Sequence, residues 1–87
     1  MAKLADKSFL KRLLETPSVT GTEARVAQLV RSRLSECADV IETDVMGSVH
    51  ACLKGTGSAP SVMIASHMDE VGLMVKSIDS QGFLHVA

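Results

Sequence analysis

The chain has 87 residues, of which 46% are hydrophobic and 22% charged, and its formal net charge is -1. This is the composition of a soluble globular protein, and the length allows at most one small domain, which would bury about 60% of its unfolded surface. The near balance of acidic and basic residues provides no field for nucleic acid or an anionic membrane. Phe9 and Phe83 are the only aromatic residues, so stacking on single strands is excluded as well.

The sequence also indicates a compartment. No apolar run approaches the roughly 20 residues that span a bilayer, and the amino terminus lacks the apolar core of a secretion signal. Cys37 and Cys52 are too few for a disulfide framework, which agrees with a reducing environment, and we expect both to be free, buried thiols. The predicted location is the cytoplasm.

Two amphipathic helices are predicted in the first part of the chain. Residues 5–15 have leucines at helical spacing from Leu4 onward, with Asp6 as the cap and Pro17 as the stop. Thr20 and Glu23 fit a capping box, which predicts that the second helix starts there. The apolar stripe of this helix consists of Val26, Leu29, Val30 and Leu34. Its arginines, which are expected on the solvent side, are Arg25, Arg31 and Arg33.

After Cys37 the hydrophobic period changes from 3.6 to 2, which indicates strands. Residues 40–45 and 49–54 are predicted to pair through a tight turn at 46–48, and residues 72–77 and 83–87 through a turn at 79–82. His50 falls on the face opposite the apolar residues, where a solvent-facing position is expected. His85 receives no role, because we find no carboxylate near it in the sequence.

The rest of the chain is organised around a predicted central strand at residues 62–65, a short apolar run that follows a loop rich in glycine, serine and proline. The run ends at the polar stretch 66–70. Ligands bind at the carboxyl ends of strands in open α/β sheets, so this stretch is the candidate site.

His67 and Asp69 are the candidate pair within this stretch. If the backbone there is extended, the side chains alternate and these two project to one side. A metal-binding histidine is usually held by a carboxylate on its second ring nitrogen, which makes His67 a candidate ligand and Asp69 the orienting group. The alternative is a purely structural hydrogen-bonded pair, and the spacing alone does not decide between them.

Four stretches of the sequence form a pattern when they are taken in order: residues 16–23 (TPSVTGTE), 44–49 (DVMGSV), 65–75 (ASHMDEVGLMV) and 82–84 (GFL). Together they resemble the amino-terminal part of the M42 family of metallo-aminopeptidases, which includes glutamyl and deblocking aminopeptidases. The third stretch is the most specific. One departure is Ser48, where the family more often has Asn.

The resemblance implies a function and a cofactor. His67 corresponds to a ligand of a dinuclear metal centre, and Asp69 to the supporting carboxylate that the family counts among its catalytic residues. Two divalent ions, zinc or cobalt, would polarise the scissile peptide carbonyl and lower the pKa of a bridging water. The implied substrates are peptides, from which N-terminal residues would be removed.

The resemblance also implies how the chain is organised. The fold class is α/β, with two amino-terminal helices followed by a mixed sheet, as an incomplete zinc-peptidase-like catalytic domain. Residues 1–71 would belong to that domain, and residues 72–87 would begin an inserted dimerisation domain. The implied partners are the remainder of the catalytic domain and, in the complete protein, further copies of the same chain.

Complete members of the family are several times longer, and a catalytic zinc site takes three protein ligands. We therefore expect the isolated chain to be inactive. Two other interpretations stay open. One is a small non-catalytic domain that associates through open strand edges, with His67 and Asp69 as a structural pair. The other is a different dinuclear peptidase family that uses His-x-Asp after a strand.

Overall fold

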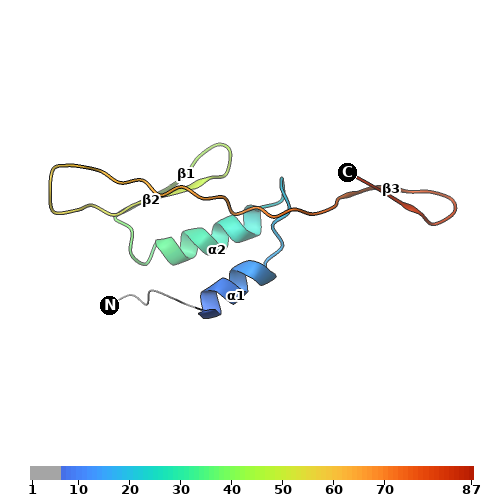
Figure 1. Ribbon diagram of the computed structural model, residues 1–87, viewed down its shortest axis with the longest axis horizontal. Coiled ribbons are helices and arrows are strands. Elements are labelled where there is room, and N and C mark those ends of the chain that lie inside the picture. The colour runs from blue at the N-terminus through green and yellow to red at the C-terminus, as the bar shows by residue number, and fades with distance from the viewer. Residues whose placement is uncertain (1–6) are drawn as a thin grey trace.

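The computed structural model describes residues 7–87, which form α1 (Lys7–Glu15), α2 (Ala24–Leu34), β1 (Val40–Thr43), β2 (Val49–Cys52), β3 (Val75–Ile78) and β4 (Leu84–Val86). The helices and the β1–β2 hairpin lie toward one end, and the β3–β4 hairpin lies at the other (Figure 1). Residues 53–74 connect the two hairpins and run past α2. Neither helix in this part of the chain has the length and apolar run that crossing a bilayer requires.

The first helix ends as the sequence predicts. The residue before a proline is disfavoured in the helical region, and α1 stops just before Thr16 and Pro17. The Thr16 hydroxyl donates to the carbonyl oxygen of Arg12 at 2.6 Å, which satisfies one of the last carbonyls of the helix. Leu4 and the predicted cap Asp6 lie outside the described residues.

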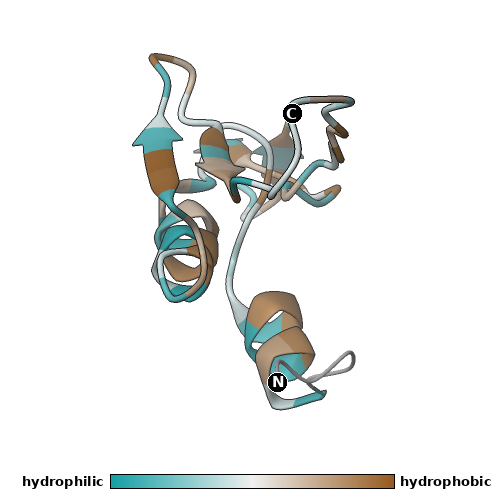
Figure 2. Cartoon of the chain, turned by 90° about the vertical axis from the view of Figure 1, so that its left-hand side faces the viewer, coloured by the Kyte–Doolittle hydropathy of each residue, from teal (hydrophilic) through white to brown (hydrophobic). Residues whose placement is uncertain are grey.

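The first helix is only lightly packed against the rest of the chain. The Arg33 guanidinium of α2 lies 5.0 Å from the centre of the Phe9 ring, a cation–π contact between the helices. Leu10 and Leu14 remain exposed. Figure 2 shows α1 set apart from the other elements, with apolar residues on its surface. Its amphipathic pattern is therefore real, but little of its apolar face is covered.

The second helix starts a few residues later than the capping box implied. Glu23 occupies the cap position without a side-chain cap bond. Its carboxylate instead accepts from the backbone N–H of Gly21. Thr20 lies three positions before the cap, too early to reach the free amides of the first turn, so the predicted capping box is wrong. Of the predicted apolar stripe, Val26 is buried, at 2% exposed, and the other three residues are half-buried.

Both predicted hairpins are confirmed, with slightly shorter strands. In the first, β1 and β2 are antiparallel, with Val40 opposite Cys52 and Thr43 opposite Val49. In the second, β3 and β4 are antiparallel, with a register irregularity between Val75 and Ser77. Each turn contains a glycine in the left-handed region, Gly47 with φ of 90° and Gly82 with φ of 86°, where other residues are strained.

The expected single mixed sheet is not present among the described residues. The four strands form two separate two-stranded sheets, which is consistent with the broader α/β class only. Residues 62–65, predicted to be a buried central strand, have no regular structure, and Ile64 is 92% exposed. A strand needs a neighbour for its backbone N–H and C=O groups, and no strand of residues 7–87 lies beside this run.

The shape of the molecule is extended. Its radius of gyration is 17.6 Å, whereas a compact domain of this length has about 12 Å. Its accessible surface is 7782 Å², against about 4,900 Å² for a folded monomer of this mass. The helices and hairpins are thus formed, but they do not close around a common core.

The open shape also explains the cysteines. Cys37 and Cys52 are both free, as predicted, but both are exposed, so the expectation of burial is wrong. Cys52 ends β2, and most residues of that strand and of β1 are exposed as well. Cys37 lies in the turn after α2.

Candidate functional site

The candidate site is the stretch that follows the exposed apolar run, and its centre is the imidazole of His67. The Nδ1 atom of this ring lies 3.0 Å from the carbonyl oxygen of Asp69 and 3.1 Å from its Oδ1 atom. Both neighbours are acceptors, so Nδ1 carries the proton and the lone pair of the neutral ring is on Nε2. The side chain of His67 is 84% exposed, and within residues 7–87 nothing occupies Nε2.

The carboxylate of Asp69 has a second partner. Its Oδ2 atom accepts a hydrogen bond of 2.5 Å from the Thr20 hydroxyl. That bond is the main cause that lowers the pKa of Asp69 below its usual value of 3.8; loss of hydration opposes it, and the hydrogen bond with His67 adds to the lowering. Asp69 is therefore an ionised, acceptor-only group at neutral pH, which agrees with the proton on Nδ1.

The backbone fixes this arrangement as well. The Glu70 N–H donates to the carbonyl oxygen of Ser18 at 2.9 Å, as part of an isolated parallel bridge between Val19 and Glu70. Ser18 is 4% exposed. This bridge joins the loop between the helices, residues 16–23, to the candidate site. Without a continuous sheet, the loop is the main support of the site among the described residues.

An open groove passes beside the site. Its lining is largely apolar and comes from both helices, the turn of the first hairpin and the site itself: Leu10, Leu13, Leu14, Val26, Val30, Met46, Val49, His67, Met68 and Asp69. The groove therefore places the imidazole next to an apolar surface.

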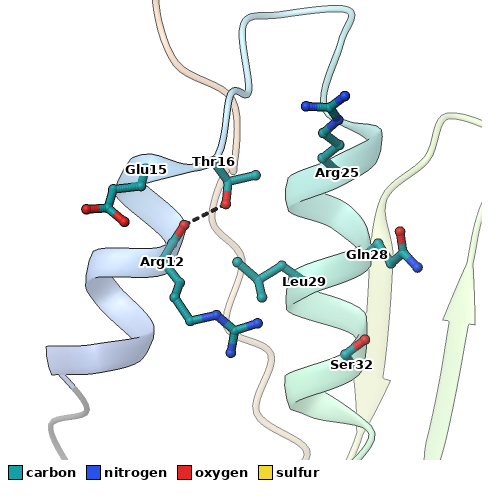
Figure 3. A pocket seen from close by; sticks show the side chains of 7 residues that line it. All are labelled: Arg12, Glu15, Thr16, Arg25, Gln28, Leu29 and Ser32. Carbon is teal, nitrogen blue, oxygen red and sulfur yellow. Dashed lines mark hydrogen bonds between the residues drawn. The ribbon is translucent and has the colours of Figure 1, made fainter.

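A smaller cleft of about 450 Å³ lies between α1 and α2, and Leu29 is one of the residues that line it (Figure 3). It includes Arg12 and Arg25, but their guanidinium groups extend in different directions and do not converge on one point. The cleft offers no convergent anion site, so the His67 stretch remains the stronger candidate.

The other two histidines share a different arrangement, which we call the Asp-Gly-His turn (residues 44–50 and 79–85). In the first turn, Oδ1 of Asp44 accepts from two backbone N–H groups and Oδ2 lies 2.8 Å from Nε2 of His50. In the second, Asp79 accepts in the same way and lies 3.1 Å from Nε2 of His85.

The assignment of no carboxylate partner to His85 was wrong, since Asp79 stands six positions before it. The repeated spacing Asp-x-x-Gly-x-x-His was the signal in the sequence. His50 is exposed, as expected, but is also paired with Asp44. Among the described residues, no group of three or more His, Cys, Asp or Glu could hold a metal ion, so His67 is not part of a three-ligand set there.

Comparison with known proteins identifies the relatives of the chain. Residues 47–87 match the sequence profile of the family described as M42 glutamyl aminopeptidase. The chain is 43% identical over 84 residues to the lysyl aminopeptidase of Pyrococcus furiosus, covering 95% of this chain and 24% of that protein. It is 35% identical over 85 residues to the glutamyl aminopeptidase of Lactococcus lactis, covering 97% of this chain and 23% of that protein.

Both relatives are named as aminopeptidases, so the chain is related to that class of enzyme. The matching family profile is that of M42, so the resemblance expected from the sequence is confirmed. The chain spans about a quarter of the length of these relatives.

Proposed function

We propose that the chain forms part of the catalytic domain of a metal-dependent aminopeptidase, in which His67 binds one of two divalent ions and Asp69 orients it. The arrangement of the His67 ring supports this most directly. Nδ1 faces two acceptors of Asp69, while Nε2 is exposed and has no partner within residues 7–87. A metal-binding histidine is held in this way, with its second nitrogen donating to a carboxylate or a carbonyl.

The imidazole of His67 is a suitable ligand for a divalent ion. Neutral imidazole suits zinc and cobalt alike. When bound, such ions supply Lewis-acid activation of the peptide carbonyl and of the attacking water. A site of this kind needs at least three protein ligands, and no group of three candidate ligands is present within residues 7–87. The remaining ligands would come from the three quarters of a relative's length that this chain does not span.

The organisation of the whole protein is part of the proposal. Residues 1–71 belong to the catalytic domain, and residues 72–87 begin an inserted domain through which copies associate. The separation of the β3–β4 hairpin from the helices supports this division (Figure 1). The substrates are the amino termini of peptides, and the location is the cytoplasm.

The isolated chain should not hydrolyse peptides, because one imidazole is too few ligands for a catalytic ion. The check is an aminopeptidase assay of the purified chain with added zinc or cobalt, followed over several protein preparations. Turnover that follows the chain through purification and is abolished by His67→Ala would contradict this expectation.

A chimaera tests the function itself. The region of the lysyl aminopeptidase of Pyrococcus furiosus that aligns with this chain is replaced by residues 1–87, and hydrolysis of an N-terminal lysine substrate is measured with and without a chelator. We expect metal-dependent activity, and a loss of about 100-fold or more with His67→Ala, since removing a ligand disrupts the ion. His85→Ala is the matched control, because that histidine lies in β4 and is paired with Asp79, away from the candidate site.

Two outcomes would overturn the proposal. A folded chimaera that fails to cleave any N-terminal residue would favour the non-catalytic association domain instead. Full activity with His67→Ala would exclude this residue as a ligand, whatever the rest of the chain contributes.

A further inference from the structure

We propose that Thr20 is a positioning residue that acts on His67 through Asp69. The three side chains form a linear relay in which the Thr20 hydroxyl donates to Oδ2 of Asp69 at 2.5 Å and Nδ1 of His67 donates to Oδ1 at 3.1 Å. Only one part of this inference rests on the proposed function, namely that the relay prepares Nε2 of His67 to bind a metal ion. The relay itself is a property of the chain.

The relay fixes how the carboxylate is turned. With both oxygens engaged from opposite partners, rotation about the Asp69 side chain would break one bond or the other. The carbonyl oxygen of Asp69 also accepts from Nδ1, at 3.0 Å, so the ring is held by two acceptors of one residue. A group that locks Asp69 therefore locks the tautomer and direction of the His67 ring.

The approach of Thr20 to Asp69 is built into the backbone. The two residues are 49 positions apart in the chain, so their contact depends on tertiary structure. The bridge between Val19 and Glu70 lies immediately beside both of them and holds the loop against the site. Threonine is also branched at Cβ, which restricts its rotamers and favours a hydroxyl that stays aimed at one acceptor.

The other two histidine–aspartate pairs show that this third partner is specific to the site. Asp44 and Asp79 use their second oxygen to accept backbone N–H groups within their own turns. Within the described part of the chain, Asp69 is the one carboxylate of these three pairs that receives a hydroxyl from a distant loop. In the two hairpins, the histidine–aspartate pair stabilises its own turn, whereas the His67–Asp69 pair is fixed in place by Thr20.

The tautomer of His67 in the metal-free chain provides the test. Two-dimensional ¹H–¹⁵N NMR of the imidazoles at pH 8, where such rings are ordinarily neutral, reports the proportions of protonated Nδ1 and Nε2. We expect protonated Nδ1 to dominate in the natural chain, and its ratio to protonated Nε2 to fall at least about twofold in Thr20→Val. Thr20→Ser retains the hydroxyl and should restore the ratio.

Thr22→Val is the matched control. Thr22 lies in the same loop, and its hydroxyl donates to the carbonyl oxygen of Val19 and not to Asp69. This variant should leave the His67 tautomer unchanged. Exchange of the Glu70 amide, measured in every variant, shows whether the bridge to the loop is intact. A natural tautomer ratio in Thr20→Val with a protected Glu70 amide would overturn the proposal, and so would an equal change in Thr22→Val.

If the Glu70 amide loses protection in Thr20→Val, Thr20→Ser decides the question. A natural ratio in the serine variant supports the relay, and an altered ratio with an intact bridge contradicts it. In the chimaera, Thr20→Val should raise the metal concentration for half-maximal reactivation by about tenfold, the lower end for residues that support ligands. If the activity does not change in His67→Ala, the proposed function is wrong but the relay is not. If the activity falls in His67→Ala while Thr20→Val changes neither the tautomer nor the metal requirement, the relay is wrong but the proposed function is not.

Discussion

At the scale of single residues, the close approach of Gly72 to Val19 fixes how the site segment passes the loop. A Cβ atom built on Gly72 would collide with a methyl group of Val19 and lie 3.1 Å and 3.2 Å from two further atoms of that side chain. Valine is stiff about its first side-chain torsion, so it yields little. Glycine is therefore needed here for space, whereas Gly47 and Gly82 are needed for their positive φ.

We predict that Gly72→Ala weakens the bridge between Val19 and Glu70 and destabilises the chain by about 1 kcal/mol, the low end for overpacking. The measurements are the urea midpoint and the exchange of the Glu70 amide. Gly55→Ala is the control, because nothing lies within 4 Å of its Cβ position. The double variant with Val19→Ala should recover the loss, and failure to do so would contradict the steric explanation.

Sequence reasoning reached part of this site. The pairing of His67 with Asp69 follows from alternation over two positions in extended backbone, and it is present although the predicted strand is not. The part played by Thr20 was assigned to a helix cap. Its contact with Asp69 depends on how a loop meets a segment 49 positions away, and no local pattern encodes that meeting.

At the scale of elements, the two hairpins are variations of one Asp-Gly-His turn. In both, the leading aspartate collects two backbone amides and the histidine across the ladder. Hydrogen bonds lower the pKa of both aspartates below 3.8, but the leading cause differs: the bond with His50 for Asp44, and the backbone amide of Phe83 for Asp79.

This difference predicts an asymmetric response to two matched variants. His50→Ala should raise the pKa of Asp44 more than His85→Ala raises that of Asp79, because the histidine bond is the leading cause of the lowering for Asp44 but not for Asp79. Carboxyl ¹³C shifts followed from pH 6 to pH 1.5 measure both. Equal movement in the two turns would refute the assigned causes.

The same shifts give a sign for acid unfolding of the hairpins. A carboxyl with a lower pKa in the folded state stabilises folding above its unfolded pKa, and this contribution is lost as the pH falls through the folded value. The backbone N–H groups of Met46 and Gln81 donate hydrogen bonds to these carboxylates. We therefore expect both amides to lose exchange protection only below about pH 3.8. Exchange measured by rapid quenching between pH 5 and pH 2 checks this, and loss of protection already at pH 5 would contradict it.

The elements were largely predictable because each is governed by local chemistry. Proline placed the end of α1, and glycine and aspartate placed both turns. The central strand failed because its pattern describes a run that is buried between neighbours, and no neighbouring strand is present in residues 7–87. The capping box failed because the cap position is Glu23, three residues after Thr20, and the Thr20 hydroxyl donates to Asp69 instead.

At the scale of the whole molecule, the elements are spread along an extended axis. The dimensions are 64 × 29 × 17 Å, with the exposed apolar run 62–65 between the two hairpins. Figure 1 shows residues 53–74 as a long connection that runs past α2 from one hairpin to the other. Composition alone suggested a small globular domain, since it counts apolar residues without revealing where their partners lie.

We predict that small-angle X-ray scattering of the dilute monomeric chain gives a radius of gyration near 17.6 Å. A compact domain of this length would give about 12 Å and an unfolded chain about 29 Å, so the three states are well separated. A value near 12 Å would mean that residues 53–74 collapse onto the helices. Denaturation in urea provides the upper reference in the same experiment.

The bridge between residues 19 and 70 also sets an order of events during folding. Both hairpins and both helices close over short loops and can form within microseconds, whereas the bridge must bring together the two ends of a long intervening stretch. During synthesis, His67 leaves the ribosome before Glu70, the residue that docks its segment onto the loop. The imidazole thus acquires its fixed direction in a late step, after the elements around it have formed.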